Sequence, residues 1–303
     1  MCHNLQKASS SSGSDDDKIL VFDSNLPVTA SLPTNVLPFS SMEDLVSSVK
    51  GDIDVVLTVL PNDAAVRDVI LNFLQLQSKF YDDVSGKEGS STLFIDSSTI
   101  SPSTTRELNN IIYLKNGNAA MLDAPMSGGV NGAENGSLTF MVGSNDDQNF
   151  ERAKTILMKM GNKVVRCGDV GMGGAAKLCN NLALGVQMIG ICEAMLLGEE
   201  FGIDPLVLAS VMNSSTAKCW SSEICNPHPD VAALSNAPAS KKYGGGFSVD
   251  LMLKDISLAI DSSGSSSLPL SSTASQMYSL AKSHGHDKQD FGVIFEFLKG
   301  KKA

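Results

Sequence analysis

The sequence predicts an α/β fold in its first half and an all-helical domain in its second. Up to about residue 168, short apolar runs alternate with helical stretches, and from Ala175 helical runs follow with few clusters of β-branched residues. Alternation of strands and helices is typical of a largely parallel sheet covered by helices. The length of 303 residues also favours two domains.

The apolar runs predict six strands, because continuous runs without alternation are typical of strands buried on both faces. These strands are Ile19–Phe22, residues 54–60, residues 93–95, Ala120–Asp123, residues 139–142 and residues 163–167. Helices are predicted between them, for example at residues 64–80 and 103–115. Ligands of such sheets bind beyond the carboxyl ends of the strands. We therefore expect the chemistry just after the strands, at Asp23, Leu60, Pro61, residues 97–99 and residues 124–129.

The domain boundary is expected in the glycine-rich segment GDVGMGG at residues 168–174, which gives domains of residues 1–168 and 169–303. In the second domain, Asp204 and Pro205 predict a helix start, with Asp as the N-cap and Pro at the first position. The apolar stretch 182–197 is interrupted by Gln187 and Glu193, and it is shorter than the ~20 residues that span a bilayer. It predicts a helix buried between domains or subunits, and no membrane partner.

Charge and cysteine content exclude some classes of function. The net charge is −10, with no basic stripe, which disfavours binding to nucleic acid because that affinity comes mainly from Lys and Arg. The six cysteines form no CxxC pair and only four histidines are present, so no metal site is expected. The cysteines are predicted to be reduced, mostly buried thiols of an intracellular protein.

Two motifs could carry chemistry. Lys177 and Asn181 are four residues apart and share a helix face, directly after the glycine-rich turn at the domain junction. A poorly hydrated lysine beside a cationic cofactor would have a lowered pKa and could act as a general acid/base, although such a pair also occurs on solvated helix faces. In DAPMSGG, Ser127 with Gly128 and Gly129 could bind a carboxylate, or the motif could be an ordinary strand-to-loop turn.

Together the motifs resemble the β-hydroxyacid dehydrogenase family. They are DAPMSGG (123–129), GDVGMGGAAKLCNN (168–181) and LMLKDISLA (251–259), while CWSSEICNP (219–227) points to its 3-hydroxyisobutyrate dehydrogenases. The resemblance runs from Met1 to about Leu298. It implies a Rossmann-type NAD-binding domain followed by a helical domain for substrate binding and dimerisation. It also implies NAD-dependent oxidation of (S)-3-hydroxyisobutyrate to methylmalonate semialdehyde in valine breakdown, in mitochondria, by a homodimer or homotetramer.

The resemblance assigns roles to matching positions. Lys177 would exchange a proton with the substrate hydroxyl, and Asn181 would orient the substrate beside it. The substrate carboxylate would be held by Ser127, Gly128 and Gly129. The residues in contact with the cofactor would be Leu60, Pro61, Thr99 and Lys254. As simpler alternatives, Lys254 could form a surface pair with Asp255, and Leu60-Pro61 could merely end a strand.

The cofactor can also be predicted from Asp23, which ends the first apolar run. A carboxylate at this place accepts hydrogen bonds from the ribose hydroxyls and repels a 2′-phosphate. The next residues, Ser24 and Asn25, supply no arginine to bind that phosphate. NAD is therefore predicted over NADP.

One expected motif is absent: no GxGxxG separates a first strand from the opening helical residues MCHNLQKA. We expect a Rossmann-type sheet without its first strand, and because that strand is central in the order 3-2-1-4-5-6, its two neighbours should lose their partners. The chain should then bind NAD poorly, and it is expected to be truncated at this end. Two other functions stay open, a tartronate-semialdehyde or glyoxylate reductase and a non-catalytic homologue.

Overall fold

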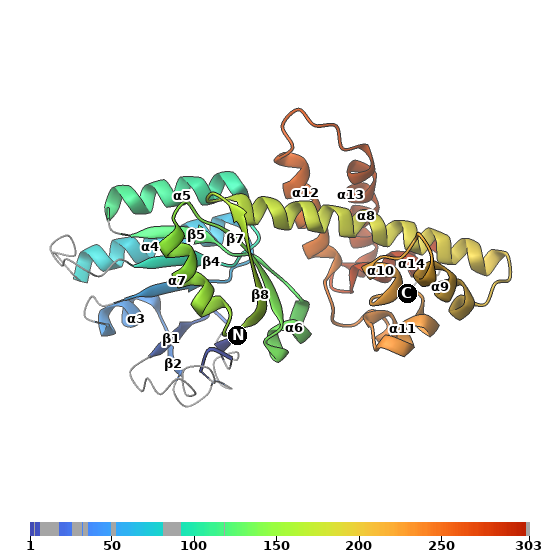
Figure 1. Ribbon diagram of the computed structural model, residues 1–303, viewed down its shortest axis with the longest axis horizontal. Helices are drawn as coiled ribbons and strands as arrows, with labels where there is room; N and C mark the ends of the chain where they lie inside the picture. Colours follow the sequence, from blue (N-terminus) through green and yellow to red (C-terminus); the bar gives the residue numbers. More distant parts are fainter. Residues whose placement is uncertain are drawn as a thin grey trace. The chain divides into compact units, whose positions relative to one another are not determined.

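The computed structural model describes residues 1–2, 4–6, 18–25, 32, 36–49, 53–80, 92–117 and 119–300. The chain divides into two compact units, Met1–Lys177 and Leu178–Ala303. Figure 1 shows unit 1 with its strands and unit 2 as an assembly of helices. The predicted fold class, a parallel-rich sheet with flanking helices followed by a helical region, is confirmed.

Unit 1 contains a six-stranded sheet in the order β3-β4-β5-β7-β6, with β8 paired to β7. Pairing is parallel from β3 to β5, and β7 runs antiparallel to β5 and β6. The strands are β3 (Val55–Thr58), β4 (Leu93–Asp96), β5 (Ala120–Asp123), β6 (Met126–Ser127), β7 (Leu138–Gly143) and β8 (Gly161–Gly168). The register aligns Thr58, Asp96, Asp123 and Gly143 across four neighbouring strands. This row marks the carboxyl edge of the parallel strands.

A second, two-stranded parallel sheet is formed by β1 (Ile19–Phe22) and β2 (Val36–Phe39). In the part of the chain that the structure describes, β1 and β2 pair only with each other, and no strand joins β1 to β3. Three of the four β3 residues are only half-buried, whereas all four of β4 are buried, as befits an edge strand next to a central one. Strand β2 was not predicted, because Pro38 lacks an N–H donor and is tolerated only at sheet edges.

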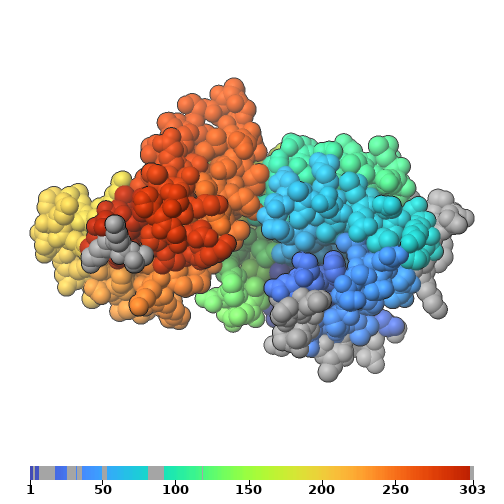
Figure 2. All heavy atoms as spheres, turned by 180° about the vertical axis from the view of Figure 1, so that it is seen from behind, coloured from blue at the N-terminus to red at the C-terminus, as the bar shows by residue number. Residues whose placement is uncertain are grey.

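Helices cover both faces of the six-stranded sheet. Phe94 and Met121 pack in one apolar cluster with α4 and α5, while the neighbouring residues Ile95 and Leu122 pack in another with α7. This alternation places the two clusters on opposite faces. The helices of unit 1 are α3 (Met42–Ser48), α4 (Asp63–Phe80), α5 (Pro102–Lys115), α6 (Gly129–Asn135) and α7 (Asp147–Leu157). Figure 2 shows α3 and α4 side by side, in blue to cyan.

The long helix α8 (Met172–Glu200) begins in unit 1 and continues into the core of unit 2. Met188, Cys192 and Met195 are fully or almost fully buried there, among aromatic residues that include Tyr278 and Phe295. By length and composition α8 alone among the described helices could cross a membrane, and 44% of its apolar window is buried in the fold. Part of the stretch 182–197 is therefore buried in the core of unit 2.

The other elements of unit 2 are α9 (Pro205–Ser214), α10 (Trp220–Glu223), α11 (Pro229–Ser235), η1 (Pro238–Lys241), α12 (Val249–Asp261), α13 (Pro269–Ala281), η2 (Lys282–His286), η3 (Phe291–Val293) and α14 (Ile294–Leu298). Asp204 caps α9 by accepting the N–H groups of Leu206 and Val207, with Pro205 at the first position, as predicted.

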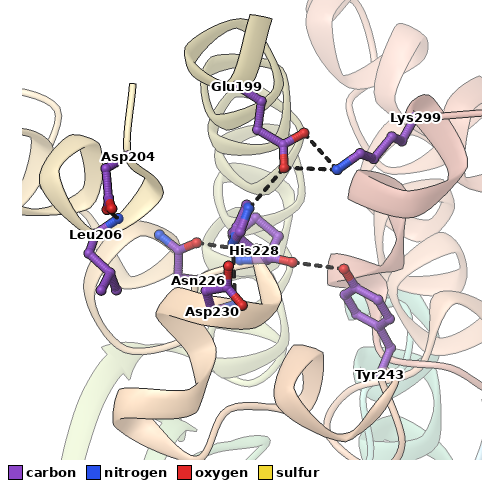
Figure 3. A network of polar contacts seen from close by, with 9 residues as sticks. Glu199, Asp204, Leu206, Asn226, His228, Asp230, Tyr243 and Lys299 are labelled. Carbon is purple, nitrogen blue, oxygen red and sulfur yellow. Dashed lines mark hydrogen bonds and ion pairs between the residues drawn. The ribbon is translucent and has the colours of Figure 1, made fainter. Parts of the chain in front are cut away.

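A polar network ties α8 to the last helix of unit 2 (Figure 3). Glu199 accepts hydrogen bonds from His228 Nε2 at 3.0 Å and from Lys299 Nζ at 2.8 Å. His228 Nδ1 accepts the N–H of Asp230 and so caps α11, which fixes the ring proton on Nε2. The segment 219–229 is thus held by buried polar contacts.

The cysteines are all free, but the expectation that most are buried is wrong. Only Cys192 and Cys225 are buried, while Cys179 is exposed on α8. Side chains of a helix point in successive directions around its axis, and composition alone does not reveal which of them face the core.

Candidate active site

The carboxyl ends of β3 and β4 are joined by side-chain hydrogen bonds. Thr58 Oγ1 donates to Asp96 Oδ1 at 2.8 Å, and the Leu60 N–H donates to Ser98 Oγ at 2.8 Å. These contacts hold the segment that follows β3 against the one that follows β4. Leu60, Pro61 and Thr99 therefore lie at one edge of the sheet, where the sequence placed them.

Two polar atoms at this edge are buried and have no hydrogen-bond partner among the described residues: Asp96 Oδ2 and Ser97 Oγ. Burial raises the pKa of Asp96. Buried polar groups are nearly always hydrogen-bonded in proteins, so unmatched ones at a strand end fit a site for a polar ligand. The edge therefore fits the polar part of a dinucleotide, although the described residues contain no glycine-rich phosphate loop beside it.

Asp123, at the end of β5, binds the first turn of α8. Its two carboxylate oxygens accept the N–H groups of Gly171 and Gly174, each at 2.6 Å. The residue is 2% exposed, and burial raises its pKa to about 6 against the opposing effect of the two hydrogen bonds. In the sequence, Asp123 was identified only as the first residue of the motif DAPMSGG. The signal that could have identified it is the absence of a capping side chain in GMGG.

Lys177 lies one turn further along α8. Its side chain is buried, at 8% exposed, and Asn181 on the next turn is 2% exposed. The pair therefore does not lie on a solvated helix face, which was the simpler alternative. The structure places the two side chains four residues apart on one helix, as the sequence predicted.

Asn181 is oriented by Asp255 of α12. Asn181 Nδ2 donates to Asp255 Oδ2 at 2.6 Å, and Lys254 Nζ lies 3.3 Å from Asp255 Oδ1. Asp255 is buried, so Lys254-Asp255 is not merely a surface pair. Gly185 allows this close approach of α8 and α12, since a Cβ there would lie 2.7 Å from Ile256 Cδ1. Sequence reasoning missed the role of Asp255, although it quoted the motif.

The motif SGG forms the turn between β6 and α6. Ser127 ends β6 opposite Thr139 of β7 and is half-buried. Gly128 and Gly129 have φ angles of 136° and 62°, in the region that favours glycine. Gly128 is the N-cap of α6, and no side chain caps the main-chain N–H groups of its first turn.

Asp23 follows β1 on the two-stranded sheet and is not paired with the six-stranded one. The side chain is half-buried, and its Oδ1 accepts the N–H of Asn25 at 2.8 Å. One oxygen is thus held by the local turn, and the structure orients the carboxylate at the end of its strand.

Comparison with known proteins identifies the relatives of this chain. A family profile described as the NAD binding domain of 6-phosphogluconate dehydrogenase matches residues 1–168. A second, described as NAD-binding of NADP-dependent 3-hydroxyisobutyrate dehydrogenase, matches residues 171–298. The mitochondrial 3-hydroxyisobutyrate dehydrogenase of Drosophila melanogaster is 39% identical over the whole chain and 86% of its own length.

The chain belongs to the 3-hydroxyisobutyrate dehydrogenase family.

Other relatives of this dehydrogenase agree. The probable mitochondrial enzyme of Dictyostelium discoideum is 45% identical, over 83% of the chain and 75% of the relative. A solved structure of the Mycobacterium tuberculosis enzyme with L-serine has a TM-score of 0.81 and 33% identity, covering 98% of this chain and 93% of that one. These matches confirm the predicted family, the class of NAD-dependent dehydrogenase and NAD as the cofactor.

Proposed function

We propose that this dehydrogenase oxidises (S)-3-hydroxyisobutyrate to methylmalonate semialdehyde, with Lys177 as the general acid/base. The observation that carries the proposal is the burial of Lys177 on the helix that Asp123 fixes to the sheet edge. A buried lysine one helix turn before Asn181 is placed to exchange a proton with the hydroxyl of a substrate that Asn181 orients. General acid–base catalysis by such a group contributes about 10²–10⁴-fold to the rate.

Bound NAD would supply the acceptor for the hydride that leaves the substrate carbon carrying the hydroxyl group. Lys177 Nζ takes the hydroxyl proton as the carbonyl forms, and it returns the proton in the reverse direction. Asn181 orients the substrate, and its amide is held for this task by Asp255.

Ser127, Gly128 and Gly129 bind the substrate carboxylate in this proposal. The positive φ angles of the two glycines shape a turn whose N–H groups are not used by a capping side chain. A hydroxyl and neighbouring N–H groups are suited to an anion because each donates a hydrogen bond to a carboxylate oxygen. The site would therefore select acids over neutral alcohols.

For the cofactor, we propose contacts with Leu60, Pro61, Thr99 and Lys254, and recognition of the ribose by Asp23. The unmatched Asp96 Oδ2 and Ser97 Oγ beside Thr99 support a polar ligand at this edge. Asp23 supports NAD over NADP, because its carboxylate repels a 2′-phosphate. The nucleotide domain of this proposal is residues 1–168, and the substrate domain is residues 169–303.

We also propose that the enzyme acts in valine breakdown and is located in mitochondria. It is proposed to assemble into a homodimer or homotetramer. The mitochondrial relatives support the location. Assembly is supported by apolar side chains of unit 2 that lie exposed on or near α8 and α9, because clusters of this kind often mark interfaces. They are Leu197, Phe201, Ile203, Leu206, Val207 and Val211.

A second candidate is a non-catalytic homologue, and the division of the strands into two sheets favours it. Calorimetry of this chain with NAD separates the two functions. Binding supports the dehydrogenase. Because weak NAD binding is expected without the GxGxxG motif, the absence of a heat of binding favours the non-catalytic homologue only if a chain extended upstream by that motif also shows none.

The mechanism is tested by Lys177→Ala, with Lys115→Ala as control, because Lys115 is exposed in the last turn of α5. We expect turnover to fall by about 10²–10⁴-fold while NAD affinity is kept, since the proton acceptor is removed but the cofactor contacts are not. Steady-state kinetics and calorimetry measure the two effects. Equal loss of turnover and NAD binding would show that Lys177 is structural.

Cofactor choice is tested by Asp23→Ala. We expect weaker NAD binding and stronger NADP binding, because the carboxylate accepts hydrogen bonds from the ribose hydroxyls and repels a 2′-phosphate. Titration of both nucleotides by calorimetry measures this, and identical NAD affinity in the variant would remove the argument.

A further inference from the structure

The first turn of α8 depends on a capping group from a distant part of the chain. The N–H groups of a helix's first turn have no partners inside the helix, and a side chain at the N-cap usually accepts one or two of them. Here the residues before and at the start of α8 are Gly171, Met172, Gly173 and Gly174, which offer no such acceptor. Asp123 supplies it from the end of β5, 48 and 51 residues away.

The same turn is pressed against the end of β7. A Cβ on Gly173 would lie 2.2 Å from Met141 O and 2.9 Å from the Gly143 nitrogen, and a Cβ on Gly143 would lie 2.4 Å from Asp123 Oδ1. Backbone therefore meets backbone at this point. The carboxylate is enclosed between the strand and the helix, and the turn has little freedom to slide or rotate.

The position of Lys177 follows from this contact because both lie on the same helix. Residues four apart lie on the same face, so Lys177 stands one turn beyond Gly173, on the face that meets the sheet. Any rotation of the first turn would swing the lysine away from its place. Its position is thus determined by the contact that Asp123 makes.

We propose that Asp123 is the positioning residue for Lys177: by capping α8 from the sheet edge, its carboxylate sets the rotation and depth of the turn that carries the catalytic amine. This inference rests on the proposed function of Lys177. Asp123 itself does not need to touch substrate or cofactor.

The test compares Asp123→Asn with Asp204→Asn. Asp204 is a matched control, since it also accepts two N–H groups of a helix start, but on α9. An asparagine offers one acceptor oxygen where the carboxylate offers two. We expect Asp123→Asn to lower kcat with little change in the KM for NAD, and Asp204→Asn to leave both constants unchanged.

A second readout needs no turnover. Lys177 is buried, so labelling of its amine by trinitrobenzenesulfonate, followed by mass spectrometry of the peptide that contains it, reports opening of the first turn. In Asp123→Asn the labelling rate should rise about fivefold, which is the change in an opening equilibrium produced by losing one net hydrogen bond of ordinary strength. In Asp204→Asn the rate should equal that of the wild type.

Each outcome bears on the proposal. Unchanged Lys177 labelling in Asp123→Asn, or an equal rise in both variants, would overturn it. If Asp123→Asn does not fold, hydrogen exchange in the wild type decides: the Gly171 and Gly174 amides should exchange more slowly than those of Leu206 and Val207, and faster exchange would overturn the proposal.

The labelling experiment can be interpreted independently of the proposed function. If the wild type shows no oxidation of the hydroxy acid, or if Lys177→Ala keeps full turnover, the function of Lys177 fails while its dependence on Asp123 can still be measured.

Discussion

Asp123 in unit 1 and Asp290 in unit 2 both cap the start of a helix, but one is distant from its helix in sequence and the other is adjacent to it. Each is a buried carboxylate that accepts two main-chain N–H groups, from Gly171 and Gly174 in one case and from Phe247 and Gly292 in the other. Asp290 caps the short helix that directly follows it, while Asp123 caps a helix that begins 49 residues later. A local cap stabilises one turn, whereas a distant cap also fixes where a helix stands on a sheet.

The largest expected loss of stability comes from replacing with alanine the glycines beside the two carboxylates, Gly246 and Gly173. A Cβ on Gly246 would lie 2.2 Å from Asp290 Oδ2 at a φ of 71°, and a Cβ on Gly173 would lie 2.2 Å from a main-chain oxygen. Overpacking costs about 1–3 kcal/mol, and positive φ adds about 1–2 kcal/mol at Gly246. Denaturant unfolding should thus show Gly246→Ala and Gly173→Ala as the two most destabilised variants.

The control for Gly246→Ala and Gly173→Ala is Gly190→Ala. Gly190 lies in the middle of α8, and a Cβ there meets nothing within 4 Å. Alanine should stabilise this helix position by about 1 kcal/mol. If Gly173→Ala were as stable as Gly190→Ala, the close contact between α8 and β7 would be refuted.

Replacing the carboxylates gives a smaller effect and separates their roles. Asp123→Asn and Asp290→Asn should each lower the free energy of unfolding by about 1–3 kcal/mol, the usual result of leaving a buried hydrogen-bonding group without its partner. Only Asp123→Asn should change the labelling of Lys177. A similar change in Asp290→Asn would mean that the two carboxylates do not differ in the way proposed.

A further expected effect is a pH dependence shared by both sites. Burial raises the pKa of Asp123 and of Asp290 from 3.8 to about 6 in the folded protein. Between these values the folded state binds more protons than the unfolded state, so their contribution to stability is present below pH ~4 and is lost as the pH rises through about 6. Chemical unfolding at a series of pH values measures the slope.

Each Asn variant should flatten that slope, since it removes one titrating group. An unchanged slope in both variants would show that the carboxylates titrate alike in the folded and unfolded states.

Much of the fold could be predicted because its signals are local. Ile19–Phe22 and Ala120–Asp123 are strands with the predicted bounds, and Asp204-Pro205 starts a helix through contacts within three residues. Strand β2 was missed because Pro38 argues against a strand unless the pairing partner is known. Burial of individual cysteines also depends on packing that the sequence does not show.

The candidate site was predictable only in part, because some of its contacts join residues that are far apart in the sequence. Lys177, Asn181 and the SGG turn lie within motifs and could be located from spacing. The partners that hold them, Asp123 for the start of α8 and Asp255 for Asn181, act across 48 to 74 residues. A long-range hydrogen bond leaves no periodic signal in the sequence, so these residues emerged only from the structure.

The central claim is that the site oxidises a 3-hydroxy acid with NAD. Its most direct test is kcat/KM of this chain for (S)-3-hydroxyisobutyrate, tartronate semialdehyde and glyoxylate, each with the NAD and the NADP couple. We predict the highest value for (S)-3-hydroxyisobutyrate with NAD. A preference for glyoxylate with NADPH would contradict the account.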